Sequence, residues 1–228
     1  MKNPVPRKVS EYISQEQIDR DLKHYQEIAL EVEGVSGAVV IGRDDSYVDP
    51  RVSYKCSIPK CFGYGTCAHC PPHTISAKET HELVQHFSDA ILIKTDVPPH
   101  AVAGEELAKA IRFGESGQAA MPTGLAVITI LKAVTQVESA AFYDGYYFAM
   151  GFGAATCKVV LCSKFDNCLV LEGKRCRHPY FARPSMEGAG FDALRMAARV
   201  GWDVYPIGSS CRPEDIPNGT LLGLVLIR

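Results

Sequence analysis

Apolar side chains recur at a helical period near the beginning of the chain, and this pattern predicts a helix over residues 15–33. Ser14, directly before this helix, has the spacing to Gln17 that is typical of an N-terminal capping box. Gly34 is a suitable residue to end the helix. The stripe of apolar positions is formed by Ile18, Leu22, Tyr25, Ala29 and Val32. We expect this helix to pack on the core, and nothing in it suggests chemistry.

The same period predicts four more helices. One covers residues 77–87 behind a capping box of Ser76 and Glu79, and two others cover residues 101–113 and 192–200. The longest covers the apolar stretch 125–150, although its Val-Ile-Thr-Ile segment could begin as a strand. Residues 43–54, 114–117 and 122–124 are expected to be loops.

Short β-branched apolar runs predict strands over residues 38–42, 90–93 and 221–227, and residues 204–207 read as a short strand or edge segment. These strands interleave with the predicted helices. The expected fold is therefore α+β, or loosely α/β, with a small sheet flanked by helices. A chain of 228 residues suits a single domain over residues 1–228.

Nine cysteines stand out against this ordinary framework, and eight of them form two quartets. Cys56, Cys61, Cys67 and Cys70 have the spacing C-x4-C-x5-C-x2-C and run into Pro71 and Pro72. Cys157, Cys162 and Cys168 repeat C-x4-C-x5-C, and Cys176 follows them. We therefore predict two metal centres, held by loops at about residues 56–72 and 157–179.

Composition favours metal ligation over disulfides. The N-terminal residues contain no apolar signal segment, so we expect a cytoplasmic protein whose thiols stay reduced. An odd number of cysteines points the same way. Hydrophobic residues make up 46% and the net charge is -2, which gives no reason to expect nucleic-acid binding. The longest apolar stretch, residues 125–131, is too short to cross a membrane and is followed by Lys132.

Four thiolates suit either an iron–sulfur cluster or zinc. Zinc sites usually pair two C-x2-4-C knuckles, and only Cys67 and Cys70 form one here. Irregular gaps in a glycine-containing loop suit a bulkier cluster better. A cysteine followed by proline, as at Cys70, also occurs in ferredoxin ligand runs. Iron–sulfur is therefore the favoured reading, with zinc as the alternative.

Several polar residues near the quartets allow more than one role. His69 could be a ligand, a proton donor or a polar loop residue, and Cys211 is either a bystander or a reactive thiol. The basic residues of the second loop either tune the cluster or form a solvated turn: Lys174, Arg175, Arg177 and His178. The candidate acid–base groups are Asp144, Glu172 and Glu187.

At these residues the chain resembles a family of predicted metal-binding proteins of unknown function, numbered 2284. The N-terminal family motif, C-x4-C-x2-Y-G followed by C-P-P, matches Cys56, Cys61, Tyr64-Gly65 and Cys70-Pro71-Pro72. The C-terminal motif, C-R-x-P-x-x-A-R-P-S-M-E-x-x-G, matches the segment from Cys176 to Gly190. The resemblance spans most of the chain and implies metal binding in anaerobic metabolism.

The chain departs from the family motifs in two ways. Cys67 is not one of the family's cysteines, so it is either an extra ligand or a bystander that leaves an open iron position. The family's second quartet is also more tightly spaced, which leaves open how Cys157, Cys162 and Cys168 ligate with Cys176.

The expected function is that of an iron–sulfur protein with one or two [4Fe–4S] clusters. It would transfer electrons to a partner enzyme, or carry out redox chemistry on a small molecule at an open cluster site. The alternatives are a zinc-stabilised binding module without redox activity and a metal chaperone or redox sensor.

Overall fold

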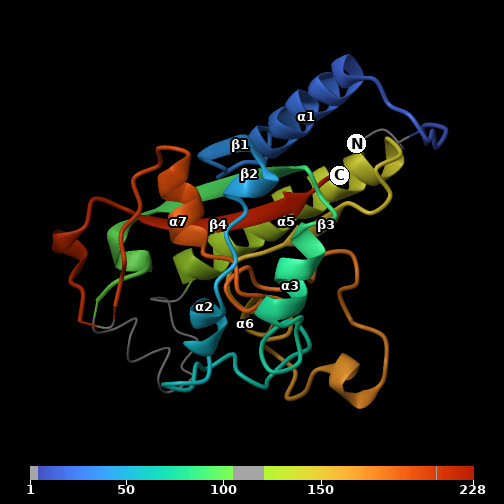
Figure 1. Ribbon diagram of the computed structural model, residues 1–228. Helices are drawn as coiled ribbons and strands as arrows, with labels where there is room; N and C mark the ends of the chain where they lie inside the picture. Colours follow the sequence, from blue (N-terminus) through green and yellow to red (C-terminus); the bar gives the residue numbers. More distant parts are fainter. Residues whose placement is uncertain (1–4, 105–120, 209) are drawn as a thin grey trace.

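The computed structural model describes residues 5–104, 121–208 and 210–228. At its centre lies a four-stranded antiparallel sheet with the strand order β1-β2-β4-β3. The strands are β1 (Gly37–Gly42), β2 (Asp89–Val97), β3 (Met150–Phe152) and β4 (Gly219–Leu226). Helices cover the sheet (Figure 1), so the fold is α+β, as the sequence predicts.

Both faces of the sheet are buried, which explains the continuous apolar runs of its central strands. In β2, Ile91 and Ile93 contribute to one hydrophobic core and Leu92 to the other. In β4, Val225 and Leu224 alternate in the same way. The first core is completed by the helices α1 (Gln15–Leu30) and α5 (Met121–Tyr143), and the second by segments that include α7 (Ala193–Arg199).

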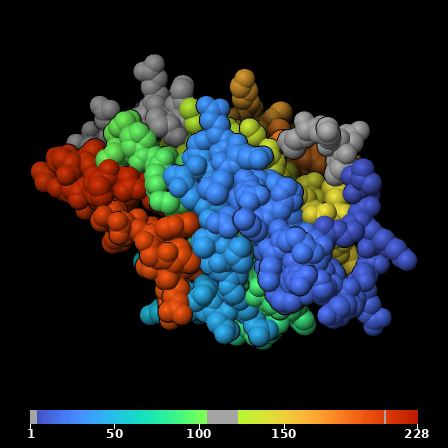
Figure 2. All heavy atoms as spheres, turned by 90° about the horizontal axis from the view of Figure 1, so that it is seen from above, coloured from blue at the N-terminus to red at the C-terminus, as the bar shows by residue number. Residues whose placement is uncertain are grey.

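The N-terminal helix α1 forms as predicted, with its apolar stripe buried and Ser14 accepting a hydrogen bond from the Gln17 amide. It ends at Leu30, three residues before the predicted end. Val32 is buried nonetheless, because the turn after the helix folds it onto the core. Figure 2 shows this blue N-terminal segment over much of the molecular surface seen from above.

The helix α5 differs most from its prediction. The expected loop over residues 122–124 is wrong, because these residues belong to the helix. Pro122 is its second residue, a position where the missing N–H has no helical partner anyway. The helix ends at Tyr143, and the predicted helix over residues 144–150 is wrong as well. Gly145 adopts a φ of 98° there, and the chain then enters β3.

By length and composition, the segment Thr123–Tyr143 of α5 could cross a membrane, with a mean hydropathy of 1.5. Buried core helices of globular proteins can have the same length and apolar composition. In the structure, Ile130, Val134 and Val137 are fully buried in the core beneath β2 and β4. This burial accounts for the apolar composition of α5.

The close approach of α5 to the sheet depends on two glycines, Gly151 in β3 and Gly153 directly after it. A Cβ atom at Gly151 would lie 2.5 Å from a side-chain atom of Val134, and one at Gly153 would lie 2.6 Å from Leu131. The Gly-x-Gly sequence therefore serves helix packing. It lies at the end of β3, a few residues before the second cysteine loop begins.

The other face carries α3 (Ala77–Val84) and α7. The predicted capping box is present, since the Ser76 hydroxyl accepts from the Glu79 amide and the Glu79 carboxylate accepts from the Ser76 amide. Both helices are slightly shorter than predicted. Their buried side chains meet Phe152 and Phe191, whose ring centroids are 4.9 Å apart.

The remaining local predictions have mixed outcomes. The predicted strand over residues 204–207 is wrong, since this segment has no regular structure and Pro206 lacks the N–H that a sheet requires. The expected loop over residues 43–54 contains the 3₁₀ turn Arg43–Asp45 and the short helix α2 (Pro50–Tyr54). The helix predicted over residues 101–113 is wrong at its start, because the 3₁₀ turn Pro99–Ala101 ends there and residues 102–104 are not helical. Residues 105–113 and the loop predicted over residues 114–117 lie outside the described residues.

Candidate metal centre

The two cysteine loops lie together at one end of the molecule, although about a hundred residues separate them in the sequence. In Figure 1 the first loop, residues 56–72, and the second loop, residues 157–179, both lie below the sheet. The segment around Ser185, which follows the second loop, contacts the first loop. The Ser185 amide donates a hydrogen bond to the His69 carbonyl at 3.3 Å. The same segment pairs with Gly153 at the end of β3.

The first loop is shaped mainly by backbone hydrogen bonds. Asp49 caps α2 by accepting from the Arg51 amide, and the helix leads directly to Cys56. The Cys61 amide then donates to the Cys56 carbonyl at 2.9 Å, and the Gly65 amide donates to the Pro71 carbonyl at 2.8 Å. These bonds close two successive turns, one over residues 56–61 and one over residues 65–71.

The second loop is held by long cationic side chains. It begins with α6 (Cys157–Val160), which is capped by the Thr156 hydroxyl. The Lys158 ammonium donates to the carbonyl oxygens of Cys162, at 3.1 Å, and Phe165. The Arg177 guanidinium donates to the Asn167 carbonyl at 2.9 Å and lies 4.2 Å from the centre of the Phe165 ring. These hydrogen bonds and the cation–π contact hold the second loop in place, although it contains little regular secondary structure.

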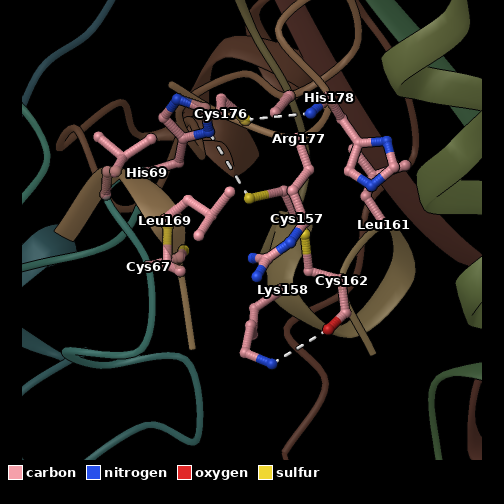
Figure 3. Close-up of a pocket in the computed structure, with 14 residues that line it drawn as sticks. Cys67, His69, Cys157, Lys158, Leu161, Cys162, Leu169, Cys176, Arg177 and His178 are labelled. Carbon is pink, nitrogen blue, oxygen red and sulfur yellow. Dashed lines mark hydrogen bonds between the residues drawn. The ribbon is translucent and has the colours of Figure 1, made fainter. Parts of the chain in front are cut away.

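Five thiols line one cavity between the loops, which we call the cysteine cavity (Figure 3). Four come from the second loop and one from the first: Cys157, Cys162, Cys168, Cys176 and Cys67. Most of the other lining side chains are apolar, among them Leu161, Leu169 and Val170. Cys56, Cys61 and Cys70 do not line it, so the two sequence quartets do not map onto two separate groups of four.

Cys67 lies where the loops meet and is only 1% exposed. Its sulfur is 3.4 Å from the Thr156 hydroxyl. Hydrogen bonds with Cys157, Cys70 and Thr156 lower the pKa of Cys67. The same contacts with Cys67, together with burial, raise the pKa of Cys70 and of Cys157. A thiolate at Cys67 is thus stabilised by thiols of both loops.

Two histidines also line the cysteine cavity. The Nδ1 atom of His69 lies 3.6 Å from the sulfur of Cys157, and burial lowers the pKa of His69. The backbone amide of His178 donates to the Cys176 sulfur at 3.3 Å. The Nε2 atom of His178 is buried and has no hydrogen-bond partner among the described residues. The contact of His69 with Cys157 joins positions far apart in the chain, so the sequence alone does not indicate it.

The remaining cysteines have different surroundings. Burial and the neighbouring Cys61 and Glu187 raise the pKa of Cys56. Burial raises the pKa of Cys162, and Arg177 opposes that shift. Cys211 lies in the loop between α7 and β4, where its carbonyl accepts from the Gly104 amide, and it does not line the cysteine cavity.

Of the three candidate acid–base groups, only Glu187 lies at the cysteines. Asp144 accepts a hydrogen bond from Tyr25 and pairs with Arg7 at the N-terminal end of the molecule. Glu172 pairs with Lys174 at 2.9 Å on the surface of the second loop. Glu187 is close enough to Cys56 to affect its pKa.

The donor atoms fit a metal that prefers sulfur. All nine cysteines are free thiols in the structure, and the eight predicted ligands lie in the two loops. Within the described ranges, no three Cys, His, Asp or Glu side chains are arranged so as to hold a single ion. The ligand role of each cysteine therefore remains a prediction.

The fold and the gathered thiols define a cysteine-rich α+β protein with a candidate metal centre. The chain belongs to the family described as predicted metal-binding protein (DUF2284), whose model matches residues 39–227. This match confirms the resemblance drawn from the motifs, and it covers both loops. Searches of the curated proteins and of the solved structures gave no match.

Proposed function

We propose that this protein binds iron–sulfur clusters and uses them in redox chemistry. One observation supports this most directly: eight thiols from two distant segments gather at one end of the fold, and five of them surround one cavity. Surrounding thiolates suit a polynuclear cluster, whereas a single zinc ion requires four donors to converge on one point.

The lining of the cysteine cavity supports this proposal. Apolar side chains such as Leu161 and Leu169 limit the access of water, which favours a stable cluster. The N–H of His178 points at the Cys176 sulfur, and the Thr156 hydroxyl contacts Cys67. Hydrogen bonds to ligand sulfurs and nearby positive charge, here from Lys158 and Arg177, raise the reduction potential of such a centre.

A bound cluster would accept or donate one electron at a time. The chain's own residues position the thiolates, shield them and adjust their electrostatic environment. We propose that the electrons pass to or from a redox partner protein or a small-molecule substrate. This activity suits a reducing cytoplasm and anaerobic metabolism, where oxygen-sensitive clusters survive.

Anaerobic purification tests the proposal. We expect a brown protein that contains iron and acid-labile sulfide, with an EPR signal after reduction by dithionite. The matched control is Cys211→Ser, which removes the thiol outside the two loops and should leave the iron content unchanged. A colourless protein with stoichiometric zinc would contradict the proposal and support the zinc-stabilised binding module instead.

A further inference from the structure

The second loop exposes apolar side chains among positive charges. We propose that it is the docking surface for an acidic electron-carrier protein, which exchanges single electrons with a centre in the cysteine cavity. Six exposed side chains of the loop define this docking surface: Lys164, Phe165, Val170, Leu171, Lys174 and Arg175. Its role rests on the proposed iron–sulfur function, whose redox partner it identifies by chemical class.

Three apolar side chains of the docking surface are open to solvent. Phe165 is 44% exposed, Leu171 is 41% exposed and Val170 is 37% exposed. Within the described part of the chain, none of them belongs to a buried hydrophobic cluster. Apolar side chains that are exposed together, rather than singly, mark surfaces that contact other molecules.

Contacts within the loop connect these side chains to one another. The Arg177 guanidinium lies 4.2 Å from the centre of the Phe165 ring and donates a hydrogen bond to the Asn167 carbonyl at 2.9 Å. The Asn167 side chain donates to Glu172, the last residue of the 3₁₀ turn that carries the other two apolar side chains. Lys174 pairs with the same carboxylate at 2.9 Å. The apolar and cationic side chains therefore form one connected patch.

A thin layer of protein separates the docking surface from the cysteine cavity. Val170 belongs to both, since it lines the cavity and is partly exposed. Arg177 and Lys158 also line the cavity (Figure 3). Arg177 contacts the Phe165 ring, and Lys158 donates to the carbonyl of the same residue. Because electron transfer slows steeply with distance, a carrier that docks here is well placed to exchange an electron with the cavity.

The charge of the second loop defines the partner as acidic. Residues 157–179 contain five lysines and arginines and two acidic residues, a net charge of +3 with histidine neutral. The whole chain has a net charge of -2, so the remaining residues carry -5. Such a local positive field attracts a negatively charged partner and speeds their encounter.

The arrangement suits a protein partner better than a nucleic acid. Aromatic and apolar side chains at the centre with charged side chains around them are typical of protein interfaces. Asp166 and Glu172 interrupt the positive charge, and both would repel phosphates. A patch of this size suits a weak, transient complex, as electron carriers form.

One electron passes in each encounter. The reduced carrier loses it, the oxidised centre behind the docking surface gains it, and no bond forms or breaks. The carrier then leaves, which requires a weak complex.

Titration calorimetry with an oxidised, acidic [2Fe–2S] ferredoxin tests the docking surface. Binding should weaken about tenfold when the salt concentration rises from about 20 to about 200 mM, because salt screens exposed charges. At low salt, Lys164→Glu/Arg175→Glu should weaken binding about tenfold or more, because it reverses two charges of the surface.

Arg20→Glu/Lys23→Glu is the matched control for the charge reversal. It changes the net charge by the same amount at two exposed residues of α1 and should leave the affinity within about twofold of the wild type. Equal losses in the two double variants would overturn the inference, because only the net charge of the protein would then matter.

Phe165→Ala tests the apolar centre of the surface. It should weaken binding about tenfold at both salt concentrations, as truncation of a central aromatic residue does in other interfaces. Leu171→Ala, outside the cation–π contact, should weaken binding about threefold and provides a second test if Phe165→Ala disturbs the loop. Wild-type affinity in both variants would overturn the inference. Circular dichroism of each variant measures whether the fold is retained.

Three further measurements separate the outcomes. In stopped-flow experiments, electron transfer from the reduced ferredoxin to the oxidised protein should slow in the same variants that weaken binding. A wild-type dimer that dissociates in Lys164→Glu/Arg175→Glu, detected by analytical ultracentrifugation, would overturn the inference by showing that a second copy covers this surface. Protein without iron and sulfide would overturn the proposed function and the electron transfer together. Protein with iron and sulfide that does not bind the ferredoxin would overturn only the docking surface.

Discussion

The two cysteine loops share the spacing C-x4-C-x5-C, but the structure holds them in different ways. Backbone hydrogen bonds close the first loop, as between Gly65 and Pro71. Charged side chains hold the second loop, through Lys158 and Arg177. The first loop contains a single lysine or arginine, Lys60, whereas the second contains five: Lys158, Lys164, Lys174, Arg175 and Arg177.

This difference shows that identical ligand spacing does not define identical sites. The second loop surrounds its thiols with positive charge and apolar side chains, which suits a centre that stores electrons. In the first loop, burial, Cys61 and the Glu187 carboxylate, which belongs to another segment of the chain, raise the pKa of Cys56. The four predictions that follow test whether the loops act as two distinct centres.

The largest effect is expected from removing two thiols of one loop. Cys56→Ala/Cys61→Ala and Cys162→Ala/Cys168→Ala should each lose about half of the bound iron, because each pair belongs to a separate cluster. Iron and sulfide analysis measures this directly. If either double variant lost all of its iron, the loops would serve one shared centre and the comparison would fail.

The next largest effect concerns the turn that carries Glu187. Gly190 has a φ of 94°, and a Cβ atom there would lie 2.6 Å from the Cβ atom of Ala77. Gly190→Ala should lower the free energy of unfolding by about 2–4 kcal/mol, measured by urea denaturation, because backbone strain and a clash combine.

Gly201→Ala is the control for this effect. Gly201 has a φ of 80°, but a side chain there would meet open space. We expect a cost of only about 1–2 kcal/mol, from the left-handed conformation alone. Equal costs in the two variants would show that the contact with Ala77 does not matter.

A moderate effect is expected from the lysine that holds the second loop. Lys158→Met should cost roughly 1–2 kcal/mol, since charge-assisted hydrogen bonds to two carbonyls are lost. Iron should then leave the second loop faster under a chelator, followed by absorbance in the Cys56→Ala/Cys61→Ala background. Lys164→Met, which changes an exposed lysine of the same loop, should release iron at the original rate.

The smallest effect is a shift in reduction potential. Arg177→Met removes a positive charge that acts on Cys162. The potential of the second loop's centre should fall by roughly 40 mV, equivalent to about 1 kcal/mol for one electron. EPR-monitored redox titration measures it, and the exposed Arg175→Met should shift it less. A shift in the signal of the first loop's centre instead would show that Arg177 acts on that centre.

Elements with a regular local pattern of apolar residues were predictable from the sequence. The central strands β2 and β4 appear as apolar runs because both of their faces are buried, and α1 appears as a regular stripe. The edge strand β3 was not predictable. It has three residues and depends on pairing with β4, about seventy residues further along the chain.

In the candidate site, too, the features that depend on long-range contacts were not predictable from the sequence. Cysteine spacing located both loops, but it suggested two independent quartets. The position of Cys67 depends on its contact with Thr156, and the position of Glu187 depends on the packing of Gly188 against Pro71. Such long-range contacts leave no periodic signal in one sequence. A threonine directly before Cys157 and a Ser-Met-Glu turn after the last ligand were the available hints.

The strand order has a consequence for how the protein is made. The edge strand β3, which leads into the second loop, is hydrogen-bonded to β4, and β4 follows every one of the eight candidate ligands in the chain. During synthesis on the ribosome, all eight thiols therefore emerge before the strand that anchors β3 exists. We expect cluster insertion to follow completion of the sheet, so a nascent chain stalled before β4 should not retain iron.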